Sequence, residues 1–185
     1  MTGMHEQPGL SSPFSARALR IVRAIDAVSV WSGKLCAWLV LPLMGVLVYE
    51  VVSRYGFSAP TLWAYDFTYM LYGSHFMLVA AFTLARQNHI RTDFVYRLLP
   101  VRWQGRIDAA LYLLFFLPAI GVFLWVTWDF AAVSWARGER SIASPWMPVI
   151  YPLKAVLPVS AALLLLQGVS EFLKSLVAAI EGRWP

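Results

Sequence analysis

Residues 109–128 have the sequence AALYLLFFLPAIGVFLWVTW, twenty consecutive residues without a charged side chain. An α-helix rises ~1.5 Å per residue, so this run covers the roughly 30 Å of a bilayer's hydrocarbon core. Asp108 and Asp129 bracket it. Pro118 interrupts it, which a membrane helix tolerates better than a soluble one. The stretch therefore predicts a transmembrane helix at about 107–128.

Three further apolar runs of similar length lie at about 31–52, 64–85 and 151–173. Of the 185 residues, 59% are hydrophobic and 14% are charged, whereas about a quarter are charged in soluble domains. A soluble fold of this size would expose large apolar patches, which lipid would solvate. The predicted fold class is an all-α integral membrane protein with four transmembrane helices.

The first span is expected to be short and bent. Its uncharged part, residues 35–49, is shorter than the hydrocarbon core, so Lys34 and Glu50 are expected at the two membrane interfaces. Pro42 lacks the backbone N–H that an interior helical turn needs, and we expect the helix to bend there.

An amphipathic helix is expected before the first span. Ser12 and Pro13 form a typical helix start, with Ser as the N-cap. Apolar residues then recur at helical spacing, and three arginines lie mostly off that face. The apolar residues are Ala18, Ile21, Val22, Ile25 and Val28, and the basic ones are Arg17, Arg20 and Arg23. This pattern is typical of a helix in the membrane interface, and docking on a soluble partner is the alternative.

The chain divides by composition into four parts. We expect a disordered lead over 1–12, an interfacial helix over 13–29, a four-helix membrane domain over 30–174 and a tail over 175–185. No compact apolar stretch with a small-residue cleavage site directly follows the lead, so the first span is expected to be retained and not cleaved as a signal peptide.

The distribution of basic residues predicts the orientation. Of the 15 lysines and arginines, eleven fall on one side of the expected membrane and four on the other. The four are Arg54, Arg137, Arg140 and Lys154. The positive-inside rule places the larger group in the cytoplasm, and an even number of spans then places both termini and the tail there.

Several classes of site are excluded. The formal net charge is +5, but the basic residues flank apolar segments without the interleaved aromatics of a nucleic-acid site. The lone Cys36 cannot form an internal disulfide. His5, His75 and His89 are too scattered for a metal or haem site, so no cofactor is expected. His75 lies mid-membrane and is either functional or a neutral histidine bonded at a helix interface.

Several charged residues are expected near the outer interface of the membrane, where they could contact partners but could not form a transport site. Glu50 and Arg54 have helical i,i+4 spacing and form either a partner contact or an interfacial ion pair. Asp66 opens the second span, where the helix dipole suits an acid. Coupled transport needs acids near the midplane and interrupted helices in two matching halves, and we expect neither. The chain is therefore not expected to carry a solute by itself.

The basic loop at 86–106 offers an alternative function. A small membrane enzyme acting on lipid would use its His89, Arg91 and Asp93. The loop has no glycine-rich phosphate cradle, and topology and anionic lipid contact explain its arginines better. A stand-alone dimeric exporter is a third hypothesis.

One stretch is more specific than the rest. Residues 61–93 have the sequence TLWAYDFTYMLYGSHFMLVAAFTLARQNHIRTD, in which Trp-x-x-Asp opens a span and His-Ile-Arg-x-Asp opens the basic loop. Further along the chain come Glu139, Pro148, Lys154, Pro158 and LLLLQG at 163–168. In order and spacing these motifs resemble the small membrane subunit of TRAP transporters, the tripartite ATP-independent periplasmic systems, over about residues 46–173.

Three positions depart from the family's pattern. Tyr65 replaces one of two acids, Asn88 replaces a glycine, and Ser144-Pro145-Trp146 replaces a glycine-rich stretch. The last departure lies in a surface loop and bears on the choice of partner, not on the fold.

The resemblance implies a non-catalytic scaffold subunit of a sodium-coupled, binding-protein-dependent secondary transporter for organic acids or similar solutes, in the bacterial inner membrane. A large multi-spanning subunit would move the solute, a periplasmic solute-binding protein would deliver it, and this chain would support the first and help to dock the second. Candidate contacts with these partners or with lipids are Glu50, Arg54, Trp63, Asp66, His89, Arg91, Asp93, Glu139, Lys154 and Gln167. The three loop residues would fix the loop against the large subunit or lipid headgroups, and a self-contained turn is the alternative.

Overall fold

The computed structural model describes the backbone of residues 13–86, 96 and 98–185. Its elements are α1 (Pro13–Ala37), α2 (Val40–Val51), the π-helix η1 (Val52–Gly56), α3 (Ala64–Ala85), α5 (Val101–Leu111), the π-helix η2 (Tyr112–Phe116), α6 (Leu117–Arg137) and α7 (Tyr151–Glu181). Within the described residues, four stretches are long and apolar enough to span a membrane: Ser15–Gly56, Ala64–Ala85, Val101–Arg137 and Tyr151–Glu181. The predicted all-α fold with four spans is confirmed.

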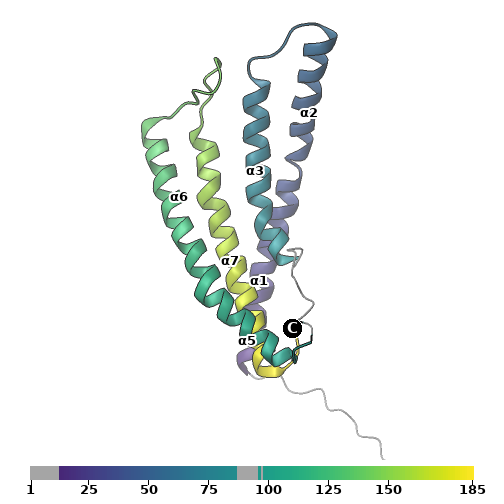
Figure 1. The fold of residues 1–185 in the computed structure, drawn as a ribbon, viewed down its shortest axis with the longest axis vertical. Helices are drawn as coiled ribbons and strands as arrows, with labels where there is room; N and C mark the ends of the chain where they lie inside the picture. Colours follow the sequence, from purple (N-terminus) through teal and green to yellow (C-terminus); the bar gives the residue numbers. More distant parts are fainter. Residues whose placement is uncertain (1–12, 87–95, 97) are drawn as a thin grey trace, which may run out of the picture.

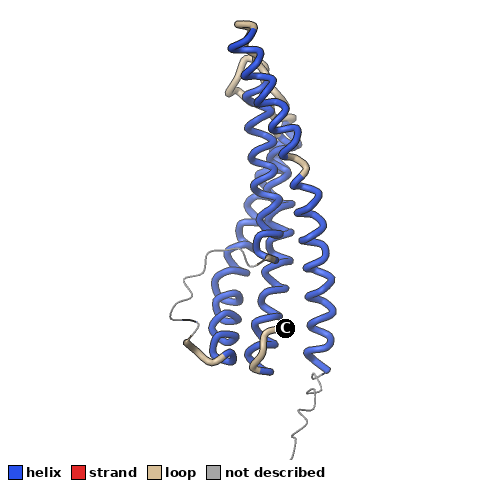
Figure 2. The backbone as a smooth tube through the Cα atoms, turned by 90° about the vertical axis from the view of Figure 1, so that its right-hand side faces the viewer, coloured by secondary structure: helices blue, strands red, loops and turns tan. Residues whose placement is uncertain are grey.

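The spans run up and down as two hairpins, α1–α2 with α3 and α5–α6 with α7 (Figure 1). α1 begins and α7 ends at one end of the bundle, which we call the termini end. The connections 57–63 and 138–150 lie at the opposite end, the loop end. The hairpins diverge toward the loop end in Figure 1, whereas the perpendicular view of Figure 2 shows the helices overlapping there as one layer.

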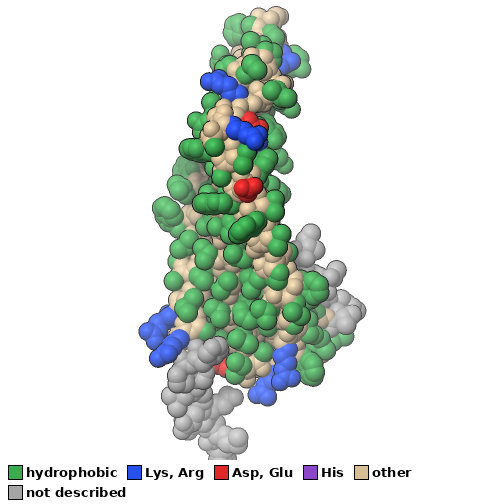
Figure 3. Space-filling model, turned by 90° about the vertical axis from the view of Figure 1, so that its left-hand side faces the viewer, with side chains coloured by type: hydrophobic (Ala, Val, Ile, Leu, Met, Phe, Trp, Pro, Cys, Tyr) green, Lys and Arg blue, Asp and Glu red, His purple; other side chains and the backbone are tan. Residues whose placement is uncertain are grey.

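The surface of the bundle is strongly apolar. Large side chains such as Trp38, Phe115 and Trp125 are 69%, 68% and 79% exposed. Figure 3 shows apolar side chains covering the face between basic residues near the two ends. Lipid solvates such a surface and water does not, so the chain is a multi-pass membrane protein.

α7 is the central helix and packs against α1, α3, α5 and α6. Its buried face is largely small or polar and includes Ser160, Ala161, Gly168, Ser170, Ser175 and Ala178. Small side chains let helix backbones approach closely in a membrane. A Cβ added at Gly105 of α5 would lie 2.5 Å from the backbone nitrogen of Ala179. Only glycine fits at that crossing without a shift of one helix.

Two spans depart from regular α-helical hydrogen bonding just before a proline. Between α1 and α2 the N–H of Leu41 donates to the carbonyl of Trp38 at 3.1 Å, an i→i+3 bond. Pro42 has no N–H to offer that carbonyl, which places the interruption at residues 38–39. η2 likewise precedes Pro118. The third span stays helical from Val101 to Arg137, so of these two spans only the first has a turn between its α-helices.

Several helices extend beyond the predicted spans. α5 begins at Val101, so the last part of the predicted loop is helical, and α6 continues to Arg137 instead of ending near Trp128. Hydropathy marks only the lipid-facing part of a helix, whereas the helix itself continues until a cap stops it. Gly138, left-handed at φ 56°, supplies that cap for α6. Residues 13–29 show no separate helix, because α1 runs unbroken to Ala37.

The buried face of α1 differs from the predicted apolar face. Ala18 and Val22 are buried as expected, but Ile21 and Val28 are 52% and 50% exposed, while Ser15 and Ser29 are buried. The buried face of α1 is therefore made mostly of small residues, and Ile21 and Val28 face outward.

Candidate interaction sites

Glu50 organises the connection between α2 and α3. Its carboxylate accepts hydrogen bonds from Nε of Arg54 at 2.9 Å and from the backbone N–H of Thr61 at 3.1 Å. The Thr61 hydroxyl also donates to it. The i,i+4 pair considered from the sequence therefore forms within the chain. Arg54, whose side chain is 51% exposed, remains accessible at the loop end.

A row of four aromatic rings crosses the loop end. Tyr49 stacks on Trp63 with ring centroids 5.6 Å apart, and Trp63 meets Phe67 edge to face at 5.7 Å. Phe67 then stacks on Trp146 at 5.4 Å. Since Tyr49 and Phe67 belong to one hairpin and Trp146 to the connection of the other, the row joins the two hairpins.

Asp66 makes a second link between the hairpins. It lies in the first turn of α3 and is 2% exposed. The hydroxyl of Ser144 donates a hydrogen bond to its carboxylate. The start of a helix also favours an acid, as expected from the sequence. Asp66 is therefore an internal residue, which the sequence placed among the partner contacts.

The connection 138–150 has a fixed shape. Arg140 and Val149 form an isolated antiparallel bridge, and the N–H of Ser141 donates to the carbonyl of Pro148 at 2.8 Å. These bonds close the base of the loop. Its tip presents Ile142, which is 91% exposed.

Glu139 and Lys154, two residues predicted as contacts, are partners of each other. Nζ of Lys154 lies 2.6 Å from Oε2 of Glu139 and 4.0 Å from the centroid of the Phe130 ring. The hydrogen bond from Lys154 lowers the pKa of Glu139 below its ordinary value. Glu139 therefore stays ionised at neutral pH, and its contact with Lys154 joins the start of the connection to α7.

A buried group of polar residues fastens α1 to α7 toward the termini end. We call it the charge cluster, and it consists of Asp26, Gln167, Ser170, Glu171 and Lys174. Nζ of Lys174 lies 2.8 Å from Asp26 and 2.7 Å from Glu171. The amide nitrogen of Gln167 donates to the same two carboxylates at 2.9 Å and 3.1 Å. The Ser170 hydroxyl donates to Asp26 at 2.7 Å.

The charge cluster was not predicted from the sequence. Gln167 was expected among the partner contacts, but it is fully buried, with 0% exposure. The signal was present on α7: residues 167, 170, 171 and 174 have i, i+3, i+4, i+7 spacing, which puts one polar stripe on an apolar helix. Such a stripe needs an internal partner, and Asp26 supplies it.

His75 is bonded at a helix interface. Its Nδ1 lies 3.0 Å from the carbonyl oxygen of Cys36, beside the interruption of the first span. A carbonyl only accepts, so Nδ1 carries the hydrogen in this contact. The geometry agrees with the alternative of a histidine hydrogen-bonded between helices.

The loop residues His89, Arg91 and Asp93 lie outside the described residues. Among the residues that are described, no group of three or more His, Cys, Asp or Glu side chains could hold a metal ion.

A family model described as "Tripartite ATP-independent periplasmic transporters, DctQ component" matches residues 43–178. None of the curated proteins matches the chain. The matched region contains α3, α5, α6 and nearly all of α7, together with most of α2. Because this family model covers well over half of the sequence, the chain belongs to the DctQ family of TRAP transporter components.

Proposed function

We propose that this chain is the non-catalytic scaffold subunit of a sodium-coupled, binding-protein-dependent secondary transporter for organic acids or similar solutes. Membership of the DctQ family implies association with the other TRAP components, a large membrane subunit and a binding protein. In this proposal the large subunit moves the solute. The present chain supports it in the bacterial inner membrane, with both termini cytoplasmic.

The charge cluster is the observation that carries the scaffold role. Its three formal charges, on Asp26, Glu171 and Lys174, pair with one another and fasten two helices. On α7 no charged residue lies between Lys154 and Glu171. Charged groups that bind a transported ion or solute usually lie near the midplane of the membrane. The buried charges of the cluster instead hold α1 against α7, which supports a structural role.

The shape of the loop end supports a docking role. The connection 138–150 is closed at its base by the Arg140–Val149 bridge and presents Ile142 at its tip. Arg54 is exposed on the other hairpin. In the proposed orientation this end faces the periplasm. A fixed apolar tip and an exposed guanidinium, already paired with Glu50, suit a binding protein that offers an apolar patch and a carboxylate.

Vesicle reconstitution tests the proposal. Vesicles are made with this chain alone, the large subunit alone, or both, and are supplied with a sodium gradient and purified binding protein loaded with labelled organic acid. We expect uptake only when both membrane subunits, the binding protein and sodium are present. Uptake or lipid turnover in vesicles that contain this chain alone would instead support the exporter or the enzyme.

A further inference from the structure

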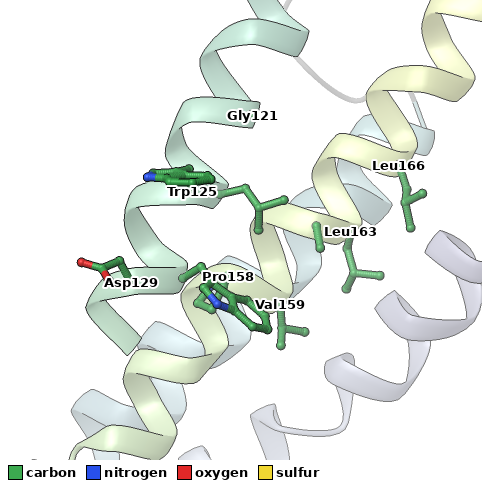
Figure 4. Close-up of a pocket in the computed structure, with 10 residues that line it drawn as sticks. Gly121, Trp125, Asp129, Pro158, Val159, Leu163 and Leu166 are labelled. Carbon is green, nitrogen blue, oxygen red and sulfur yellow. The ribbon is translucent and has the colours of Figure 1, made fainter. Parts of the chain in front are cut away.

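An open cleft runs between α6 and α7. Its volume is about 640 Å³. Apart from one acid, its lining is apolar side chains and glycine, contributed by both helices. Figure 4 shows Gly121 and Trp125 on α6 and Leu163 and Leu166 on the neighbouring α7. The cleft lies on the lipid-exposed surface, since Trp125 is 79% exposed.

The cleft allows the backbone of another helix to come close. A Cβ added at Gly121 would meet nothing within 4 Å, so space is open above α6 at this point. Ala162 of α7 also lines the cleft. Transmembrane helices associate through close packing at small residues, because lipid gives no hydrophobic gain for helix contact. The cleft therefore has the surface composition of a helix-packing site.

Polar groups at the cleft lack partners. The indole N–H groups of Trp125 and Trp128 and the carboxylate of Asp129 make no hydrogen bond or ion pair with any described residue. Asp129 is exposed, and Figure 4 shows its carboxylate projecting from α6 away from α7. It lies six residues, or ~9 Å, below Trp135, which contacts Tyr151 near the loop end.

These polar groups decide between possible occupants. An acyl chain offers no acceptor to the indole N–H groups of Trp125 and Trp128. A second copy related by a two-fold axis through the cleft would bring a second Asp129 toward the first, which repels. A helix that carries a donor or a cation opposite Asp129 satisfies the acid, and its apolar and small residues fill the cleft.

We propose that the α6–α7 cleft is the docking site for a transmembrane helix of the large TRAP subunit. This helix presents small apolar residues to Gly121 and a basic or hydrogen-bond-donating side chain to Asp129. The inference rests on the proposed scaffold function and adds to it the face through which the subunits meet.

Gly121→Leu is the main test, and Gly45→Leu on α2 is its matched control. Both glycines lie in apolar helices, and a Cβ at either meets nothing within 4 Å. Thermal unfolding of each variant without the large subunit checks that the chain itself still folds. Each variant is co-expressed with the large subunit, solubilised in mild detergent and purified through a tag on the small chain. We expect Gly121→Leu to lose at least tenfold of the co-purified large subunit and Gly45→Leu to keep it. Equal recovery with both variants overturns the proposal.

Crosslinking gives an independent readout. A photo-reactive phenylalanine analogue is placed at Leu163 in the cleft or, as a control, at Met44, which is 55% exposed on α2. We expect a crosslink to the large subunit from position 163 and none from 44. Asp129→Asn should lower co-purification severalfold, because it removes the charge and keeps the shape. A crosslink between two copies of this chain, or only to lipid, overturns the assignment of the cleft.

The two proposals fail in different ways. If the unaltered chain does not co-purify with the large subunit, the scaffold function fails. If it co-purifies and Gly121→Leu does too, while native mass spectrometry shows the loss of a bound lipid, the scaffold function stands and the cleft is a lipid site.

Discussion

The two ends of the bundle hold their helices together in different ways. At the termini end the contacts are buried and close: the charge cluster joins α1 to α7, and Gly105 brings α5 against the α7 backbone. At the loop end the hairpins diverge and are joined through one connection, by the Asp66–Ser144 bond and the Phe67–Trp146 stack.

The termini end is therefore the rigid end of the bundle, and the loop end is the adaptable end. A buried ion pair loses much stability when one partner is removed, since the other charge remains in a poorly solvating interior. A pair of aromatic rings near the surface contributes only about 1 kcal/mol beyond its buried area. A scaffold that stays attached at one end and receives a transient partner at the other needs both kinds of contact.

The strongest challenge to the rigid end is Lys174→Met. The change leaves Asp26 and Glu171 close together without their cation, and we expect a loss of ~3–5 kcal/mol in the free energy of unfolding. Thermal unfolding in detergent measures it. Lys34→Met, at an exposed position on α1, is the control and should change little. Equal melting of the two variants would mean that the charge cluster does not hold the helices.

Gly105→Ala tests the close backbone contact at the same end. The new methyl would lie 2.5 Å from the nitrogen of Ala179 and 2.7 Å from the carbonyl oxygen of Ser175, so α5 must move. Overpacking of this kind typically costs about 1–3 kcal/mol. Gly121→Ala, which meets open space, should be neutral or slightly stabilising because alanine favours helix. The same unfolding measurement distinguishes them, and a neutral Gly105→Ala would rule out the tight crossing.

Trp146→Ala tests the adaptable end. Loss of the stack on Phe67 should cost roughly 0.5–1.5 kcal/mol beyond the lost apolar burial and should let the hairpins separate. Spin labels at the exposed positions Leu62 and Ile142, in a Cys36→Ser background, report the distance between hairpins. We expect the distance distribution to broaden. Trp135→Ala, which removes a contact within one hairpin, should leave it unchanged.

The smallest effect is expected from pH at Glu139. Its pKa is lowered in the folded chain, so its pairing with Lys154 contributes stability above the ordinary pKa of glutamate and loses it as the pH falls through the lowered value. An acid titration followed by tryptophan fluorescence should show a small transition below about pH 4.3, the reference pKa. Glu139→Gln should abolish it, and a transition that persists would assign it to another group.

The sequence predicted the spans because the thickness of the membrane limits how long an apolar run must be. α3 begins and ends where hydropathy placed it, at Ala64 and Ala85. The other helices extend beyond their apolar runs, since a helix ends at its cap and not at the lipid boundary. Gly138 shows this for α6. The face of α1 was predicted only in part: Ala18 and Val22 are buried, but Ser15 and Ser29 take the places expected of bulkier apolar residues.

Contacts in the candidate sites could be predicted only where the two residues lie close together in the sequence. Glu50 and Arg54 lie on one helix, so their pairing followed from i,i+4 spacing. Asp66 bonds to Ser144, 78 residues away, and Gln167 bonds to Asp26, 141 residues away. No spacing rule for a single helix reaches such partners. The α6–α7 cleft likewise depends on how two helices cross, which composition does not determine.

The length of the first span has a mechanical consequence. Ser15–Gly56 comprises 42 residues, or ~63 Å at ~1.5 Å per residue, about twice the hydrocarbon thickness. The interruption at residues 38–39 lies near its middle, where His75 bonds to the carbonyl of Cys36. The half before the turn is tied to α7 through the ion pair of Asp26 with Lys174, and the half after it packs on α3. One continuous segment of chain therefore connects the buried fastening near the termini end with the Glu50 contacts at the loop end.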